Sequence, residues 1–241
     1  MLFYTAALDG KVIHVDLPLI HVLTFITSRT SADTNTWRPV IHRDIKVENI
    51  FVMSLGGKKD LSDIVVKLGD FGLASYYDPS MAKMPGRLGT ALMWPPEQTW
   101  ENREATPAGD VWAVGSVIHE LAHGFPPVVD PELTKKAWST DVPFGPTWSK
   151  ALRESFWDAK SERRPIPINL EKSAQESDTR RRRPTPKYSD RLNVSLMAAL
   201  EVSVEERATA CELKNKLAEE HVAFLFDEMQ AQNEVLQNED S

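Results

Sequence analysis

Two short polar motifs, separated by two apolar runs, constrain this chain more than any other feature. The first is His-Arg-Asp-Ile-Lys-Val-Glu-Asn at residues 42–49, and the second is Lys-Leu-Gly-Asp-Phe-Gly-Leu-Ala at residues 67–74. The stretches 49–53 and 63–68 are rich in Ile and Val, which predicts two strands that pair as a small hairpin with a long connection. The fold must therefore place this hairpin beside the first motif.

The first motif combines three chemical functions within six residues. Asp44 supplies a carboxylate, Lys46 a cation and Asn49 an amide oxygen. Phosphoryl transfer needs a carboxylate that orients the attacking hydroxyl, a cation near the phosphate and a ligand for Mg²⁺. A His-Arg-Asp stretch alone is also typical of an ordinary polar loop, but Lys and Asn at this spacing favour the catalytic interpretation.

The second motif follows the second predicted strand. Asp70 is predicted to hold Mg²⁺ against nucleotide phosphates, and Gly72 allows the backbone to turn sharply after it. A strand that ends beside glycines is common in itself. Its place after the first motif makes the two motifs together a much more specific signal.

With both motifs in this order, the chain resembles the C-terminal lobe of eukaryotic-type serine/threonine protein kinases. The wording of the motifs is similar to that of NIMA-related kinases. Pro95-Pro96-Glu97 stands where the family usually has Ala-Pro-Glu, so Pro95 is a departure from the pattern. The resemblance runs from about residue 18 to 220, and its further landmarks are Gly89-Thr90, the helix start at 110–115, the loop 124–127 and Arg207-Ala208-Thr209.

The resemblance implies ATP and Mg²⁺ as cofactors and protein Ser/Thr hydroxyls as substrates. Lys46 and Thr90 favour serine/threonine specificity over tyrosine specificity. Phe51 would lie under the adenine ring, although an ordinary core residue of a strand is the alternative. The implied catalytic residues are Asp44, Lys46 and Thr90, and the implied cofactor-binding residues are Asn49, Phe51 and Asp70, of which Asn49 and Asp70 would bind the metal.

Other residues receive regulatory or structural roles from the same resemblance. Glu97 and Arg207 would form a buried ion pair that fastens the activation segment to the last helices. Asp110 would brace the backbone of the catalytic loop, and otherwise it is simply an acidic residue at a helix N-terminus. His42 and Phe71 would stack on each other.

Arg43 directly precedes Asp44, the base that the resemblance implies, and predicts control by a phosphorylated activation segment, because Arg pairs bidentately with phosphate. The candidate acceptors are Ser75, Tyr76, Tyr77 and Ser80.

The predicted fold is mainly α (α+β), a kinase-like C-terminal lobe with a small β-hairpin beside the catalytic loop. We expect the chain to divide into an unassigned segment at 1–17, the lobe at 18–225 and an acidic tail at 226–241. A charged, Pro-rich insertion at 160–187 is expected to be exposed. Apolar periodicity predicts helices at 18–29, 109–122, 148–157, 190–200 and 209–236.

Charge and cysteine content exclude several classes of function. The formal net charge is −7, and residues 217–241 carry seven acidic side chains and no Lys or Arg, so the remainder is balanced. No basic excess points to nucleic acid, and the apolar stretch 12–27 is too short and too polar to span a membrane. One cysteine, Cys211, fits an intracellular protein of the cytoplasm or nucleus.

The phosphate-covering half of a kinase is expected to be absent from this sequence. A Gly-rich loop and a strand lysine should precede the catalytic loop by a long distance. Residues 1–41 contain one glycine, Gly10, and one lysine, Lys11. Two hypotheses follow. The first is the catalytic half of a serine/threonine kinase that is weak or inactive alone, either cut from a longer protein or completed by a partner that supplies an N-lobe. The second is a non-catalytic kinase-like binding module.

Overall fold

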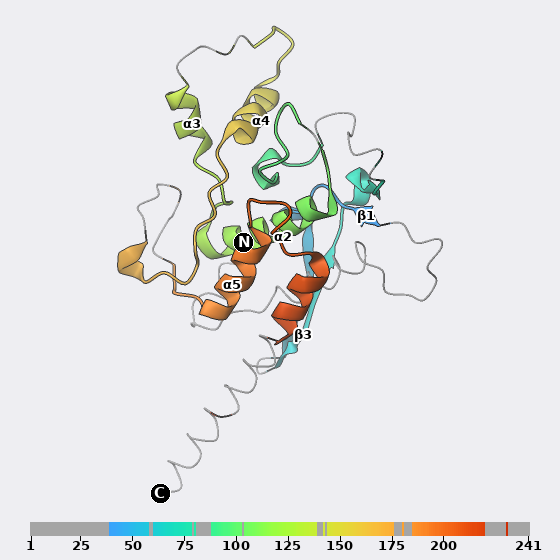
Figure 1. Cartoon of the computed structure of the whole chain (residues 1–241), viewed down its shortest axis with the longest axis vertical. Helices are drawn as coiled ribbons and strands as arrows, with labels where there is room; N and C mark the ends of the chain where they lie inside the picture. Colours follow the sequence, from blue (N-terminus) through green and yellow to red (C-terminus); the bar gives the residue numbers. More distant parts are fainter. Residues whose placement is uncertain are drawn as a thin grey trace, which may run out of the picture.

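Helix α2 (Pro107–His123) lies in the middle of the molecule, and the other elements are arranged around it (Figure 1). The structure is a computed structural model that describes residues 39–57, 60–78, 80, 88–102, 104–138, 142, 144–175, 180, 185–219 and 230. The Thr106 side chain caps α2 by accepting from the Gly109 amide, and Gly124 ends it with φ 89°. Apolar residues line most sides of α2, so it is buried nearly all round, as the sequence predicted.

Helix α5 (Asp190–Ala199) packs directly on α2. Gly115 makes this close approach possible, because a Cβ on it would lie 2.9 Å from two carbons of Leu200 and 3.0 Å from Ala199 Cβ. Helical residues 210–219 add Leu213 and Leu217 to the same core. The predicted helix 209–236 therefore agrees with the structure as far as residue 219, and the predicted helix 18–29 lies outside the described residues.

Two small antiparallel sheets flank the core. Strands β2 (Ile50–Gly57) and β3 (Asp60–Leu68) form the predicted hairpin, and β1 (Val40–Ile41) pairs with β4 (Ser75–Tyr76). The prediction of a long connection was wrong, because Gly57 pairs with Asp60. Glycine backbones still carry the donor and acceptor that a ladder requires, and irregular register near Leu55 accommodates them.

Short helices complete the chain beyond this core. Helices α3 (Pro131–Ala137) and α4 (Lys150–Lys160) pack on each other, and α4 also contacts the 3-10 turn η5 (Ala91–Met93). Aromatic side chains fill this second cluster, including Trp94, Trp100 and Phe156. The remaining 3-10 turns are η2 (Val47–Asn49), η3 (Phe71–Leu73) and η6 (Lys172–Ala174).

The segment 160–187 is not uniformly exposed, which corrects the sequence prediction. Ser161, Ile168 and Thr185 are buried, and Ile168 belongs to the main core around α2. The prediction failed because a few apolar and small residues within a polar, Pro-rich stretch produce no periodic pattern.

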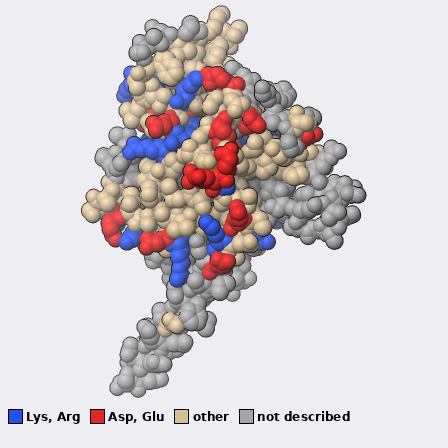
Figure 2. Space-filling model, in the orientation of Figure 1, with Lys and Arg blue, Asp and Glu red and all other residues tan. Residues whose placement is uncertain are grey.

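Charges on the described surface are mixed in sign. On the face shown in Figure 2, Lys and Arg side chains alternate with acidic ones and form no continuous basic field. No helix in the described ranges combines the length and apolar character needed to cross a bilayer.

We predict that Gly115→Ala destabilises the fold although alanine is normally the better helix residue. The new methyl group would overlap Leu200 and Ala199, and overpacking of this kind costs about 1–3 kcal/mol. Gly109→Ala is the matched control on the same helix, because its Cβ would lie 3.5 Å from the nearest atom. Urea denaturation should show a lower free energy of unfolding for Gly115→Ala only. Equal effects of the two substitutions would contradict the close packing of α2 on α5.

Candidate functional site

The buried carboxylate of Asp110 holds the backbone of the loop that carries the first motif. Its Oδ2 accepts from the His42 amide at 2.7 Å and its Oδ1 accepts from the Arg43 amide at 3.0 Å. Burial raises the pKa of Asp110 to about 6, although both amide bonds and the Arg43 charge oppose this. One side chain of α2 thereby fixes two successive peptide groups of the loop.

The His42 ring connects the two polar motifs. Its Nε2 donates to the Gly69 carbonyl at 3.0 Å, and its Nδ1 accepts from the Asp44 amide at 3.3 Å. Burial lowers the pKa of His42, which favours the neutral ring that this pair of bonds requires. Phe71 meets the ring edge-on with centroids 4.9 Å apart, so His42 and Phe71 are in contact but do not form the predicted stack.

A tight backbone contact joins the loop to the chain near residue 90. Arg43 has φ 70°, a left-handed conformation that is unusual outside glycine. Gly89 has φ 81°, and a Cβ on it would lie 2.2 Å from the Arg43 carbonyl oxygen. Only glycine therefore fits at position 89, and it lets Thr90 approach the loop.

Asp44 is the centre of the polar cluster. Its Oδ1 accepts from the Thr90 hydroxyl at 2.7 Å, and its Oδ2 lies 2.9 Å from Lys46 Nζ and 3.3 Å from Asn49 Nδ2. Burial alone would raise the pKa of Asp44, but the hydrogen bonds from Lys46 and Thr90 outweigh it and lower the pKa. Lys46 Nζ also donates to Thr90 Oγ1 at 3.1 Å, which closes the network. The result is an ionised carboxylate with fixed orientation.

Two oxygen donors beside this cluster suit a hard cation. The Asn49 side-chain nitrogen donates to the main-chain carbonyl of Asp44 at 2.8 Å, so the side-chain oxygen of Asn49 points away from that carbonyl. Asp70 is exposed at φ 59°, and its carboxylate accepts from the Gly72 amide at 3.3 Å. Amide and carboxylate oxygens are the ligands that Mg²⁺ prefers. Phe51 is 51% exposed, so it is not a buried core residue.

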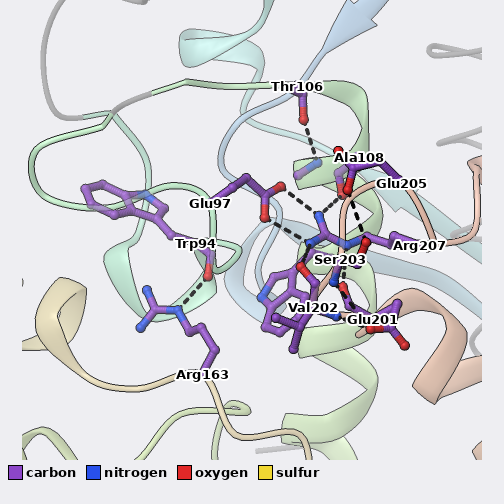
Figure 3. Close-up of polar contacts among 12 residues, drawn as sticks. Trp94, Glu97, Thr106, Ala108, Arg163, Glu201, Val202, Ser203, Glu205 and Arg207 are labelled. Carbon is purple, nitrogen blue, oxygen red and sulfur yellow. Dashed lines mark hydrogen bonds and ion pairs between the residues drawn. The ribbon is translucent and has the colours of Figure 1, made fainter.

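The ion pair between Glu97 and Arg207 lies beside the N-terminus of α2 (Figure 3). Its two hydrogen bonds, 2.8 and 2.9 Å long, form the bidentate geometry typical of Arg with a carboxylate. Arg207 also donates to the carbonyls of Ala108 and Glu201, and its guanidinium lies 5.2 Å from the Trp112 ring centroid. The predicted pair therefore ties residue 97, the first turn of α2 and the segment after α5 together.

Sequence reasoning missed Arg163. It lies in the stretch expected to be exposed, yet its side chain donates to the carbonyls of Ala91 and Trp94 at 2.7 Å each. Figure 3 shows the bond to Trp94. An arginine in a polar, Pro-rich stretch carries no pattern that distinguishes it from a surface residue.

Comparison with known proteins decides the family. A family model described as a protein kinase domain matches residues 36–217. The chain belongs to the protein kinase family. The match includes both polar motifs, the Asp110 brace and Arg207. It leaves the prediction of an absent N-lobe unconfirmed.

Similar curated proteins are serine/threonine kinases. They include the mouse serine/threonine-protein kinase Nek3, 40% identical over 35% of this chain, and the probable kinase nek3 of Dictyostelium discoideum, 32% identical over 48%. Serine/threonine-protein kinase SSN3 of Pyricularia oryzae is 38% identical over 44% of the chain. The resemblance to serine/threonine kinases, including NIMA-related ones, is confirmed. The chain spans 15%, 10% and 21% of the lengths of these three relatives.

We predict that Asp110 makes the stability of the fold fall as pH rises from 3.8, its ordinary pKa, to about 6, its pKa in the folded chain. Between these values the folded chain keeps a proton that the unfolded chain has released. The contribution is therefore complete below the lower value and lost through the upper one, with a size of about 3 kcal/mol.

Asp110→Asn removes this titration. Urea denaturation of both proteins across this range should give a difference in free energy of unfolding that declines with pH and then becomes constant. A difference that is flat throughout would contradict the raised pKa.

Proposed function

We propose that the chain carries the catalytic loop of a protein kinase that transfers phosphate from ATP to Ser or Thr hydroxyls of proteins. The observation that supports this best is the Asp44 cluster, in which Thr90, Lys46 and Asn49 hold one ionised carboxylate from both sides. An ionised, oriented carboxylate accepts a hydrogen bond from an approaching hydroxyl and takes its proton. The lowered pKa of Asp44 keeps it in that form at neutral pH.

Lys46 and Thr90 act around this base. Lys46 donates to Thr90 and pairs with Asp44, so its ammonium group stands beside the point where the hydroxyl would attack. A cation in that place stabilises the charge that develops on the transferred phosphate. The Thr90 hydroxyl fixes the Asp44 rotamer because it donates to one oxygen while Lys46 and Asn49 bind the other.

Asn49 and Asp70 are the residues that would hold Mg²⁺, and Phe51 is the residue that would contact the adenine ring. When bound, Mg²⁺ neutralises charge on the nucleotide phosphates. The exposed Asp70 carboxylate, the amide oxygen of Asn49 and the half-exposed Phe51 ring support this assignment. ATP and protein substrates are therefore the proposed partners.

The chain as printed is proposed to have weak activity or none. No Gly-rich loop can be written within residues 1–41. Without such a lid, positioning of the phosphates would be lost, and positioning alone is worth several kcal/mol. A partner that supplies an N-lobe would restore it. The alternative function, a kinase-like binding module without catalysis, would leave the chain inactive even then.

We predict that Asp44→Asn abolishes phosphoryl transfer, since the amide cannot accept the hydroxyl proton, and the loss should be about 10²-fold or more. The assay uses radiolabelled ATP and a generic Ser/Thr substrate, with the printed chain and a fusion to a kinase N-lobe. Recovery in the fusion that disappears with Asp44→Asn would support the proposal. Asp190→Asn, an exposed aspartate on α5, is the control and should keep the wild-type rate. A fusion that neither binds ATP in the presence of Mg²⁺ nor turns over would favour the binding module.

Regulation by phosphorylation is a further part of the proposal. The Arg43 side chain is partly exposed, and a guanidinium is the group that pairs bidentately with phosphate. Tyr76 is 69% exposed and Ser75 is partly exposed, so a kinase could reach both.

We predict that mass spectrometry of the protein from its native cell finds a phosphate between residues 75 and 88. An unmodified segment in an active full-length form would contradict this regulation.

A further inference from the structure

One arginine outside both motifs binds four backbone carbonyls at once. Arg163 Nε donates to the Trp94 carbonyl and Nη2 donates to the Ala91 carbonyl, each at 2.7 Å. Nη1 donates to the Ser161 carbonyl at 2.7 Å and to the Asp158 carbonyl at 3.1 Å. Four of the five guanidinium donors are therefore used on main-chain oxygens (Figure 3 draws the bond to Trp94).

The two edges of the guanidinium serve two different elements. Nε and Nη2 bind both ends of the turn η5, whose own bond runs from the Trp94 amide to the Ala91 carbonyl. Nη1 binds carbonyls at the C-terminal end of α4, where a cation is favoured. A lysine has three donors on one atom and cannot span both elements in this way.

The backbone around Arg163 is itself fixed to the scaffold. Residue 163 forms an isolated antiparallel bridge with Val128, and the Val129 amide donates to the Glu162 carbonyl at 2.9 Å. The Arg164 amide donates to the Pro127 carbonyl at 2.7 Å. Because this strand-like contact follows α2 directly, the position of the guanidinium is set by the core.

The turn η5 begins next to the base. Ala91 follows Thr90, whose hydroxyl donates to Asp44 and accepts from Lys46. A shift of the Ala91 carbonyl would move Thr90 and loosen both contacts. We propose that Arg163 is a positioning residue for phosphoryl transfer, which holds η5 and, through Thr90, keeps the Asp44–Lys46 pair in register. This inference rests on the proposed kinase function for its catalytic part.

The test compares wild type with Arg163→Met, Arg163→Lys and, as the matched control, Arg164→Met at the exposed neighbouring arginine. Amide hydrogen exchange of the full chain should rise about tenfold or more at Met93 and Trp94 in Arg163→Met, with α2 and α5 unchanged. Limited acylation of Lys46, measured by mass spectrometry, should become faster because its Thr90 contact is weakened. Arg163→Lys should lie between, and Arg164→Met should match wild type.

In the fusion to a kinase N-lobe, Arg163→Met should lower kcat about ten- to a hundredfold and leave KM for ATP unchanged. Faster exchange throughout α2 and α5 would overturn the proposal in favour of a general structural role. Unchanged exchange at η5, unchanged acylation of Lys46 or an unchanged kcat would also overturn it. Absence of turnover in the wild-type fusion to a kinase N-lobe would count against the proposed function alone, since exchange and acylation still report how η5 is held.

Discussion

The carboxylate of Asp110 binds the amides of His42 and Arg43, and this contact joins the central helix to the loop that carries the base. Everything at the site is placed relative to these two peptide groups. Burial opposes the charge on Asp110, so the contact is made at a cost that the surrounding core must offset. The helix that supplies Asp110 is packed on nearly every side. The loop at 42–49 is therefore bonded directly to a rigid part of the core.

Around this brace, two arginines link elements through main-chain or carboxylate oxygens. Arg207 joins Glu97 to the first turn of α2, and Arg163 joins η5 to α4. The left-handed backbone of Arg43 lies against Gly89. The planar guanidinium groups of Arg207 and Arg163 each donate several hydrogen bonds to fixed acceptors. The ammonium group of a lysine could not make the same set of bonds. The segment 88–102 is thus held from two sides while its own secondary structure is limited to one short turn.

Much of this arrangement could be predicted from the sequence, because its signals are local. The apolar runs between the 42–49 and 67–74 motifs predict the hairpin, and apolar periodicity predicts α2. The family resemblance predicts the pairing of Glu97 with Arg207. What failed depends on tertiary contacts. The long connection expected in the hairpin is absent because Gly57 pairs with Asp60. Ile168 and Arg163 lie in a stretch whose composition resembles exposed chain. No periodicity marks a residue whose partners are backbone carbonyls.

The long reach of these contacts has a consequence for how the molecule is made. Asp110 lies 68 residues beyond its partner His42, and Arg207 lies 110 residues beyond Glu97. Contacts between residues this far apart in sequence form slowly, because the chain loses the entropy of closing a large loop before the contacts stabilise it. During synthesis Asp44 and its neighbours emerge early. The ion pair that holds the segment 88–102 through Glu97 can form only after Arg207 has left the ribosome. A ribosome that stalls before that point would release a chain with both motifs present and no assembled site.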